Sequence, residues 1–328
     1  MGAVFRWVKF IYEWCKDFGL LLCGLTENPG LSYFVDVTNG NDGNSGKDWK
    51  HAFEHIQKAI LTQIADNAGL PLGGLGDTIY IAPGNYVEEL TGDLTRVSLI
   101  GVPGKYPWHI VSVRPPASYA YHGTLFEALI KNICFLSAPA THPEYPIMLL
   151  DNARYSIIED CHFVGTTETP SEAGIQIGPT DVDDLTECHL DYCIIRRNRF
   201  DTWFGHNSEC FAGIKIGDVA GAGGGVKQIV GTTIEDNEIY AANYGMYFLV
   251  GTPNADYCVI RRNTIDSMIR RNGCAVAGIE FLAGDYPIVA DNRINAEDAI
   301  VTPGGWPERT FNNFVTDAGV GPVRELPV

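Results

Sequence analysis

The chain has 328 residues, 45% of them hydrophobic, so it can bury the core of one large domain or of two smaller ones. Its 40 acidic and 23 basic residues give a net charge of -17, which repels nucleic-acid backbones and anionic membrane surfaces. The 9 cysteines are too sparse for a small disulfide scaffold and form no CxxC pair, so we expect them to be small buried hydrophobic residues.

Residues 1–30 predict an amphipathic helix. Its apolar residues recur near helical spacing: Phe5, Trp7, Val8, Ile11, Trp14, Cys15, Phe18, Leu21 and Leu22. Charged residues such as Arg6, Lys9 and Glu13 interrupt the segment too often for a membrane span, and it is a poor match to a secretion signal. We expect this helix to attach the protein to its own oligomer or to a carrier. Binding to a membrane surface is the less favoured alternative, because the polar face is not strongly basic.

The glycine-rich stretch YFVDVTNGNDGNSG at 33–46 is followed by a helix predicted over about 47–68. The apolar face of that helix would contain Trp49, Phe53, Ile56, Ile60 and Ile64. In the glycine-rich stretch, Asp36, Asp42 and Asn44 could hold a calcium ion, although simple turn chemistry is the favoured interpretation. The strand-like GDTIYIAPGNY follows at 76–86.

An eight-residue segment, DYCIIRRN at 191–198, recurs as DYCVIRRN at 256–263. Related copies are SIIEDCHF at 156–163, TTIEDNEI at 232–239 and PIVADNRI at 287–294, and TFNNFV around Asn313 is a candidate sixth. Each of the first five copies precedes a second strand pattern: GIQIG at 174, GIKIG at 213, GMYFL at 245, GIEFL at 278 and AIV at 299. One repeat therefore holds two strands and a loop of variable length.

Strand-like repeats of this period without a helix predict a solenoid in which each coil pairs with the next. Equivalent residues would then stack about 4.8 Å apart, so that asparagines at one bend hydrogen-bond along the stack. The predicted ladder column consists of Cys161, Asn198, Asn237, Asn263 and Asn292. The predicted inward apolar row consists of Ile158, Ile195, Ile234, Ile260 and Val289.

The charges that precede the ladder column alternate in sign from copy to copy. The two columns contain Glu159, Arg196, Glu235, Arg261 and Ala290, and beside them Asp160, Arg197, Asp236, Arg262 and Asp291. If the copies are adjacent coils, each carboxylate lies between guanidinium groups of neighbouring strands. The basic octamer then recurs on every second coil, and these acids are structural rather than catalytic.

The segment from YFVDVTNGNDGNSG through the predicted helix to GDTIYIAPGNY resembles the entry segment of the pectate-lyase-like superfamily of right-handed parallel β-helix proteins. The resemblance covers residues 33–315 and implies an all-β, single-stranded solenoid whose first coil is capped by the helix. The predicted organisation is an attachment helix at 1–30, a β-helix domain at 31–315 and a tail at 316–328. The superfamily includes lyases, hydrolases, epimerases, virion tailspikes and inert adhesins, so the resemblance favours a fold more than a function.

The candidate site combines the second strands with the loops that precede them. Gln176, Lys215, Tyr247 and Glu280 would stack on one outer face. The longest loops, DTWFGHNSECFAG at 201–213 and DSMIRRNGCAVAG at 266–278, lie beside it. Glycoside hydrolysis needs two carboxyl groups, which makes Glu280 or Glu209 the candidate acid and Asp201 or Asp266 the candidate base. The expected substrate-binding residues are Trp203, His206, Lys215, Tyr247, Arg270 and Arg271; the alternative for every one is a structural role in a solvated or packed loop.

We therefore expect a virion tailspike-like or decoration protein that binds, and in one version cleaves, a cell-surface polysaccharide. The resemblance further implies a homotrimer, located on a virion and attached through residues 1–30. One alternative is a secreted bacterial polysaccharide lyase or glycoside hydrolase. Another is a structural spike without glycan activity. No partner nucleic acid, membrane span or required cofactor is expected.

Overall fold

The computed structural model describes most of the chain from residue 30 onward. The described residues are 30–68, 76–104, 110–138, 145–165, 173–178, 189–201, 212–217, 228–240, 244–248, 258–266, 277–281, 288–296, 298–301, 310–317 and 324–325. The predicted attachment helix lies outside them. No helix in the described ranges is long and apolar enough to cross a lipid bilayer.

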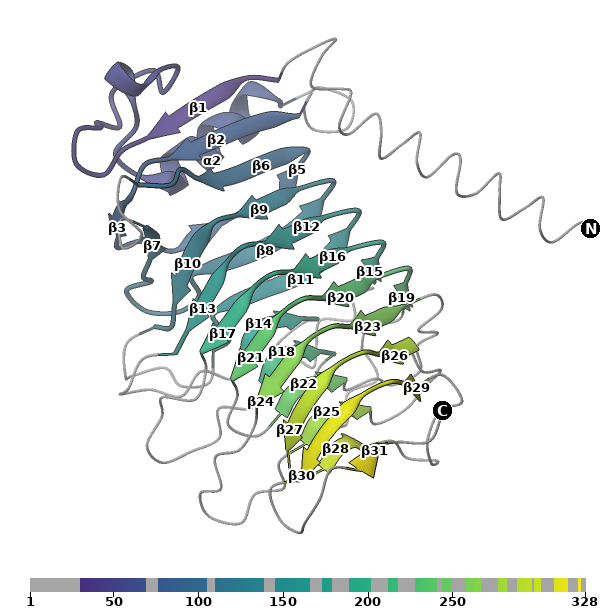
Figure 1. The fold of residues 1–328 in the computed structure, drawn as a ribbon. Helices are drawn as coiled ribbons and strands as arrows, with labels where there is room; N and C mark the ends of the chain where they lie inside the picture. The colour runs from purple at the N-terminus through teal and green to yellow at the C-terminus, as the bar shows by residue number, and fades with distance from the viewer. Residues whose placement is uncertain are drawn as a thin grey trace, which may run out of the picture.

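The described chain winds into a stack of coils with three long sheets along its sides (Figure 1). Sheet A contains β1 (Ser32–Val35), β2 (Asp77–Ile81), β6 (Val97–Gly101), β9 (Leu129–Lys131), β12 (Ile157–Glu159), β16 (Ile194–Arg196), β20 (Thr233–Glu235), β23 (Val259–Arg261), β26 (Ile288–Ala290) and β29 (Thr310–Phe311). Its neighbouring strands are parallel, and each comes from the next coil along the chain. This is the predicted right-handed parallel β-helix.

Sheet B lies beyond the bend that follows each strand of sheet A. It contains β3 (Gly84–Tyr86), β7 (Val111–Val113), β10 (Ile133–Leu136), β13 (His162–Val164), β17 (Arg199–Asp201), β21 (Glu238–Tyr240), β24 (Thr264–Asp266), β27 (Arg293–Ala296), β30 (Phe314–Asp317) and β31 (Arg324–Glu325). The last strand, β31, pairs with β30 in the antiparallel direction. Residues beyond 316 therefore add a strand to the sheet.

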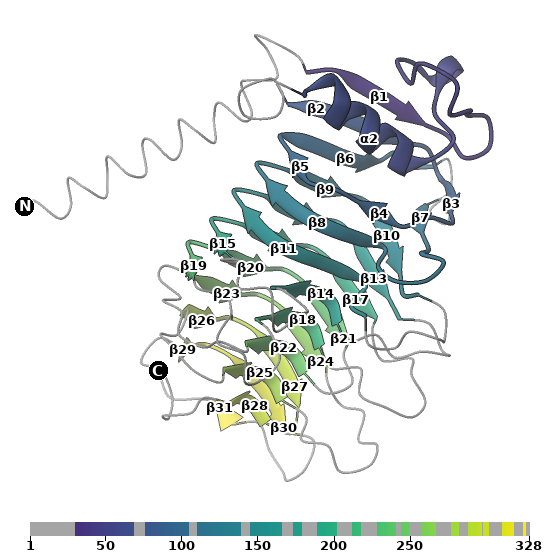
Figure 2. The ribbon, with the colours of Figure 1, turned by 180° about the vertical axis from the view of Figure 1, so that it is seen from behind.

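Sheet C forms the face seen in Figure 2 and carries the predicted second strands. It contains β4 (Leu90–Thr91), β5 (Leu94–Thr95), β8 (Tyr121–Phe126), β11 (Met148–Arg154), β14 (Ala173–Ile177), β15 (His189–Asp191), β18 (Ala212–Ile216), β19 (Gln228–Val230), β22 (Tyr244–Phe248), β25 (Ala277–Phe281) and β28 (Asp298–Val301). Inward-facing residues of the three sheets form one continuous apolar core. The predicted row from Ile158 to Val289 belongs to it, at no more than 3% exposure.

An asparagine ladder holds the bend between sheets A and B together, as predicted. The Oδ1 atom of Asn237 accepts hydrogen bonds from the backbone N and the Nδ2 of Asn198, at 3.0 and 3.1 Å. Asn237 in turn donates its backbone N and Nδ2 to Oδ1 of Asn263, at 3.0 and 2.9 Å. The ladder continues through Asn292 to Asn313, so the candidate sixth copy is confirmed. The residue before each rung, such as Arg197 or Asp236, has a positive φ that turns the chain.

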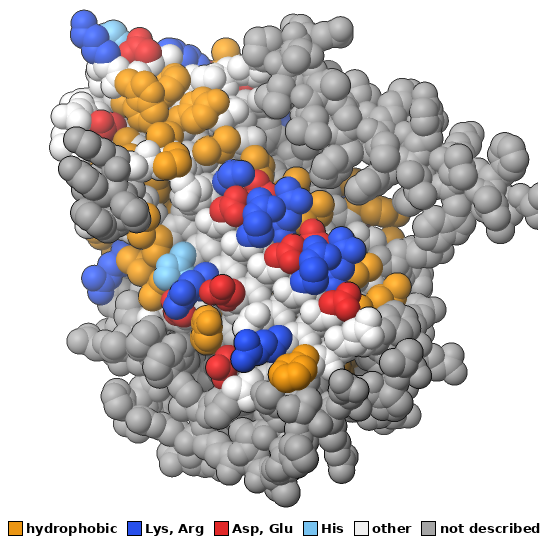
Figure 3. Space-filling model, viewed as in Figure 1, with side chains coloured by type: hydrophobic (Ala, Val, Ile, Leu, Met, Phe, Trp, Pro, Cys, Tyr) orange, Lys and Arg blue, Asp and Glu red, His pale blue; other side chains and the backbone are white. Residues whose placement is uncertain are grey.

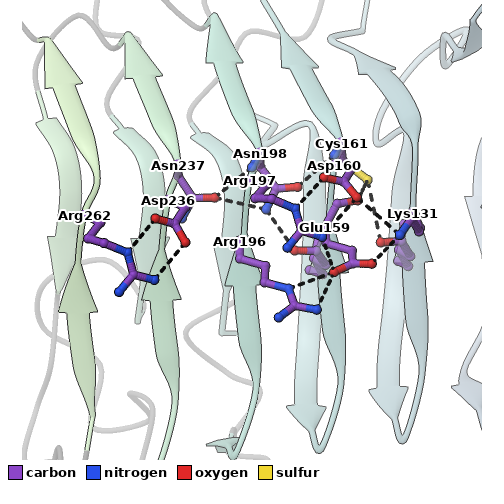
Figure 4. A network of polar contacts seen from close by, with 12 residues as sticks. Lys131, Glu159, Asp160, Cys161, Arg196, Arg197, Asn198, Asp236, Asn237 and Arg262 are labelled. Atoms are coloured by element: carbon purple, nitrogen blue, oxygen red, sulfur yellow. Dashed lines mark hydrogen bonds and ion pairs between the residues drawn. The ribbon is translucent and has the colours of Figure 1, made fainter. Parts of the chain in front are cut away.

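The copies with alternating charges lie on adjacent strands of sheet A. The prediction that the basic octamer recurs on every second coil is therefore also confirmed. Figure 4 shows the network, and Figure 3 shows acidic and basic side chains grouped together on the outer surface. Arg197 donates from Nη2 to Glu159 at 2.7 Å and from Nε to Asp160 at 2.8 Å. Arg262 binds Glu235 and Asp236 in the same way.

The expectation that every carboxylate lies between two arginines needs correction. Each arginine forms its ion pairs with the acids of the preceding coil. Glu159 and Asp160 have a cation on both sides only because Lys131 approaches from the previous coil, at 2.7 and 3.3 Å. The alternating charges on sheet A therefore form separate clusters of ion pairs and not one continuous row.

Acidification is expected to destabilise these clusters. Hydrogen bonds from Arg197 and Arg262 lower the pKa of Asp160 and Asp236 below the ordinary 3.8, and Lys131 and Arg196 outweigh burial to lower that of Glu159 below 4.5. A lowered folded-state pKa contributes stability above the unfolded value, and that stability is lost as the pH falls through the folded value. The free energy of unfolding should therefore fall below about pH 4.5, measured by urea titration at successive pH values.

The double variant Arg197→Ala/Arg262→Ala provides the control for acidification. It removes the guanidinium groups that bind Asp160 and Asp236 but keeps the carboxylates and the other cations, Lys131, Arg196 and Arg261, so its unfolding free energy should depend less steeply on pH across this range. Equal pH dependence in the two proteins would mean that other acids account for the loss.

The helix α2 (Ile56–Asp66) lies at the N-terminal end of the stack, against β1, β2 and β4 (Figure 2). The predicted range of 47–68 is too long. Phe53 forms a parallel bridge with Val35 of β1, in which its backbone N–H donates to the carbonyl of Phe34 and its carbonyl accepts from the backbone N of Asp36, and this keeps the chain extended before the helix. Glu88 then accepts the backbone N–H groups of Ile56 and Gln57 at 2.9 and 2.8 Å, which caps the helix N-terminus.

The predicted apolar face of the helix is right only in part. Ile56 and Ile60 are fully buried, and Phe53 is 2% exposed. Trp49 lies in the 3-10 turn η1 (Trp49–His51) and is 44% exposed, and Ile64 is 38% exposed. Of the five residues, only Ile56 and Ile60 are both helical and buried.

The carboxylates of the glycine-rich turn contact nearby donors. Asp36 accepts from the backbone N of Thr38 at 2.9 Å, and Asp42 accepts from the backbone N of Glu54 at 3.0 Å. Asn44 donates to the carbonyl of Ala52 at 2.9 Å. Across the described ranges, no three His, Cys, Asp or Glu side chains are grouped so as to hold a metal ion. Calcium binding at this turn stays a prediction.

Candidate functional site on sheet C

The predicted outer row of sheet C exists in register. Gln176 pairs with Lys215, Lys215 with Tyr247 and Tyr247 with Glu280, on the four consecutive strands β14, β18, β22 and β25. The neighbouring residues on each strand, such as Ile214 and Ile216, are fully buried in the core. The alternation of the strand therefore directs these polar side chains outward.

Two tyrosines, Tyr244 and Tyr247, lie beside the Glu280 carboxyl group at one end of the row. The rings of Tyr244 and Tyr247 stack at 4.4 Å, 12° from parallel. Burial raises the pKa of Glu280; a hydrogen bond from Tyr244 lowers it, and the charge of Asp298 on the next strand raises it further. Burial and the Glu280 charge also raise the pKa of Tyr247. A carboxyl group that holds its proton to higher pH than usual is suited to act as a general acid.

The other half of the row is polar but enclosed. Gln176 is 1% exposed and Lys215 is 3% exposed. Within the described part of the chain, the Oε1 atom of Gln176 accepts no hydrogen bond. A buried amide and a buried ammonium on one face are the kind of fixed polar groups that orient a ligand.

Asp201 and Asp266 lie on sheet B and not in this row. The Oδ2 atom of Asp201 contacts His162 Nε2 at 2.7 Å and accepts from Arg199 Nε at 2.8 Å. Burial raises the pKa of Asp201, but these two partners outweigh it and lower the value overall. The carboxylate is thus engaged with neighbours on its own sheet.

The two candidate bases occupy equivalent positions, as the repeat predicts, but Tyr240 stands between them. Two strand spacings separate them, which is about 9 to 10 Å. Asp266 accepts from Asn295 Nδ2 at 3.3 Å. The other predicted site residues, Trp203, His206, Glu209, Arg270 and Arg271, lie outside the described residues.

The sequence reasoning missed Tyr244 and Asp298. Both occupy a column that holds alanine on other strands, Ala212 and Ala277 among them. An alignment of the second strands shows this departure: AGIQI, AGIKI, YGMYF and AGIEF, followed by DAIV. The site that the geometry assembles is therefore Gln176, Lys215, Tyr244, Tyr247, Glu280 and Asp298, which we call the sheet C site.

Comparisons with known proteins concern the fold. No protein-family model and no curated protein sequence matches this chain. A DFA-IIIase from Arthrobacter chlorophenolicus A6 has a similar structure at a TM-score of 0.47 and 16% identity, covering 86% of this chain and 66% of its own. A pectin methylesterase in complex with a hexasaccharide has a TM-score of 0.45 and 10% identity, and the match covers 89% of this chain and 92% of that protein. The pectin methylesterase from Aspergillus niger has a TM-score of 0.40 and 11% identity, and the match covers 90% of this chain and 93% of that protein. The strand topology itself makes this chain a right-handed parallel β-helix protein.

Proposed function

We propose that this protein binds a polysaccharide along the outer face of sheet C. The observation that carries the proposal is the sheet C site itself: Tyr247 and the carboxyl group of Glu280 lie in one register row, Tyr244 stacks on Tyr247 from the neighbouring column, and the enclosed Gln176 and Lys215 continue the row. Aromatic rings pack against the apolar faces of sugars, and the polar groups bind hydroxyls. A row that runs along the stack suits an extended polymer better than a compact metabolite.

Replacing Tyr247 with Ala should weaken polysaccharide binding at least about tenfold, because it removes a stacked ring from the centre of the site. The ligand is first found on a panel of neutral and acidic surface polysaccharides, and affinity is then measured by calorimetry. Tyr80→Ala is the matched control, since Tyr80 is a half-buried tyrosine stacked on Phe34, on the outer face of sheet A. Equal affinity of Tyr247→Ala and wild type would contradict the proposal.

The raised pKa of Glu280 favours a second candidate function, cleavage of the bound polymer. In that version Glu280 protonates the leaving oxygen, as a general acid does in glycoside hydrolysis.

The setting that we propose is a virion, where the β-helix would act as a homotrimeric tailspike-like or decoration protein attached through residues 1–30. A secreted polysaccharide lyase or glycoside hydrolase and a non-catalytic spike are the alternatives. Detection of the intact Met1 N-terminus in purified material would count against secretion with a processed leader.

A further inference from the structure

A second group of rings lies on sheet C, toward the N-terminal end of the stack. Tyr119 precedes β8, His122 lies within β8 and Tyr145 precedes β11. The ring of Tyr119 is 5.0 Å from that of His122 and 4.9 Å from that of Tyr145, with interplanar angles of 50° and 60°. All three side chains are half-buried. We call these three residues the aromatic cluster.

Polar contacts fix the cluster in place. His122 Nε2 lies 3.1 Å from Asp151, a residue at a register shift in β11. Glu89 accepts the backbone N–H groups of Ala117 and Ser118, at 3.1 and 2.7 Å, and so anchors the segment that leads to Tyr119. The rings are therefore held in position before any ligand arrives.

The aromatic cluster lies on the same register line as the sheet C site, and Leu149 between them is 1% exposed. His122 pairs in register with Leu149, and Leu149 pairs with Gln176, the first residue of the predicted row. From His122 to Glu280 there are five strand-to-strand steps, which corresponds to about 24 Å. This distance is greater than a disaccharide spans, so one ligand that contacts both ends must be an oligomer.

The charges around the cluster indicate which sugars it can accept. A hydrogen bond with Asp151 raises the pKa of His122. The negative charges of Asp151 and Asp93 raise it further. Glu89 lies at the same end of the sheet. Three carboxylates against one histidine repel a uronate, whereas neutral hexose rings bring no charge to desolvate.

We propose that the aromatic cluster is a second sugar-binding subsite, which takes neutral residues of a polysaccharide whose other end occupies the sheet C site. The inference rests on the proposed function. It adds that the ligand is a largely neutral polymer and that binding requires a chain long enough to reach from Glu280 to Tyr119.

The test compares disaccharide, tetrasaccharide and octasaccharide fragments of the bound polymer by calorimetry. Wild-type affinity should rise steeply once the fragment spans both groups. Tyr119→Ala/Tyr145→Ala should lose at least tenfold in affinity for the octasaccharide and less than twofold for the disaccharide. Tyr145→Ala alone should show the same selective loss, and it serves if the double variant unfolds.

Four outcomes would overturn the inference. One is octasaccharide affinity unchanged in both variants while Tyr247→Ala weakens it, which leaves the proposed function intact. Another is an equal loss for short and long fragments. The third is a wild type that prefers polyuronate fragments to neutral ones through these tyrosines; failure to bind any glycan would remove the proposed function as well.

Discussion

Replacing Asn237 with Leu is expected to lower the free energy of unfolding by about 3 to 5 kcal/mol. The side chain is 1% exposed, and its Oδ1 and Nδ2 atoms connect three successive coils. Leu leaves the backbone N–H of Asn198 and the carbonyl of Ile195 without their partners. Each buried group left unpaired costs about 1 to 3 kcal/mol, and the leucine volume adds strain at a tight bend.

Urea unfolding followed by circular dichroism measures the effect. Asn39→Leu is the control, because Asn39 makes the same kind of amide hydrogen bond, to Asp36, at an exposed turn. The control should cost less than about 1 kcal/mol. A similar small loss for Asn237→Leu would show that the ladder contributes little beyond ordinary bend geometry.

The repeat made the ladder predictable from sequence, because a solenoid copies its local chemistry at each coil. Asn198, Asn237 and Asn263 share one column of the alignment, and their stacking follows from strand spacing alone. The same logic places Gln176, Lys215, Tyr247 and Glu280 in one row. Features that recur are visible in a single sequence when the fold itself is periodic.

Features that occur only once were predicted less well. The start of α2 depends on Glu88, which caps the helix from 31 or 32 residues away, and on the pairing of Phe53 with β1. Neither contact leaves a periodic signal, so the apolar spacing alone extended the helix too far toward its N-terminus. Arg197 and Arg262 bind the acids of the preceding coil and not those of the next one. Strand register does not determine which of the two neighbours a side chain binds.

The candidate site also has a part that the repeat predicts and a part that it does not. Its strand residues follow the repeat, whereas the partners of Asp201 come from His162 on another coil and from Arg199 on its own strand. Tyr119 and Tyr145 precede strands of the early coils, outside the clear repeats, so no column drew attention to them. Sequence reasoning therefore located the face but not its full length.

Replacing Glu280 with Gln is expected to reduce polymer cleavage about 10²- to 10⁴-fold and to change binding less than about threefold. Gln keeps the size and most hydrogen bonds of the side chain but cannot donate the proton. Release of new reducing ends or of unsaturated products from the bound polysaccharide measures the rate. Asp201→Asn is the control on sheet B: it should lower stability by breaking the contacts with His162 and Arg199 but leave cleavage within about threefold.

The pH profile distinguishes an acid from a residue that only supports the site. Because burial and Asp298 raise the pKa of Glu280, its protonated form persists to higher pH than for an ordinary glutamate, and cleavage declines as the pH rises through that value. Asp298→Asn removes the nearby negative charge, so it should lower the pKa of Glu280 and move this decline to lower pH. A profile that does not move, or a Glu280→Gln protein that cleaves at the wild-type rate, would contradict the assignment of Glu280 as the acid. Binding that survives with no cleavage in any variant would instead favour the non-catalytic, glycan-binding form of the protein.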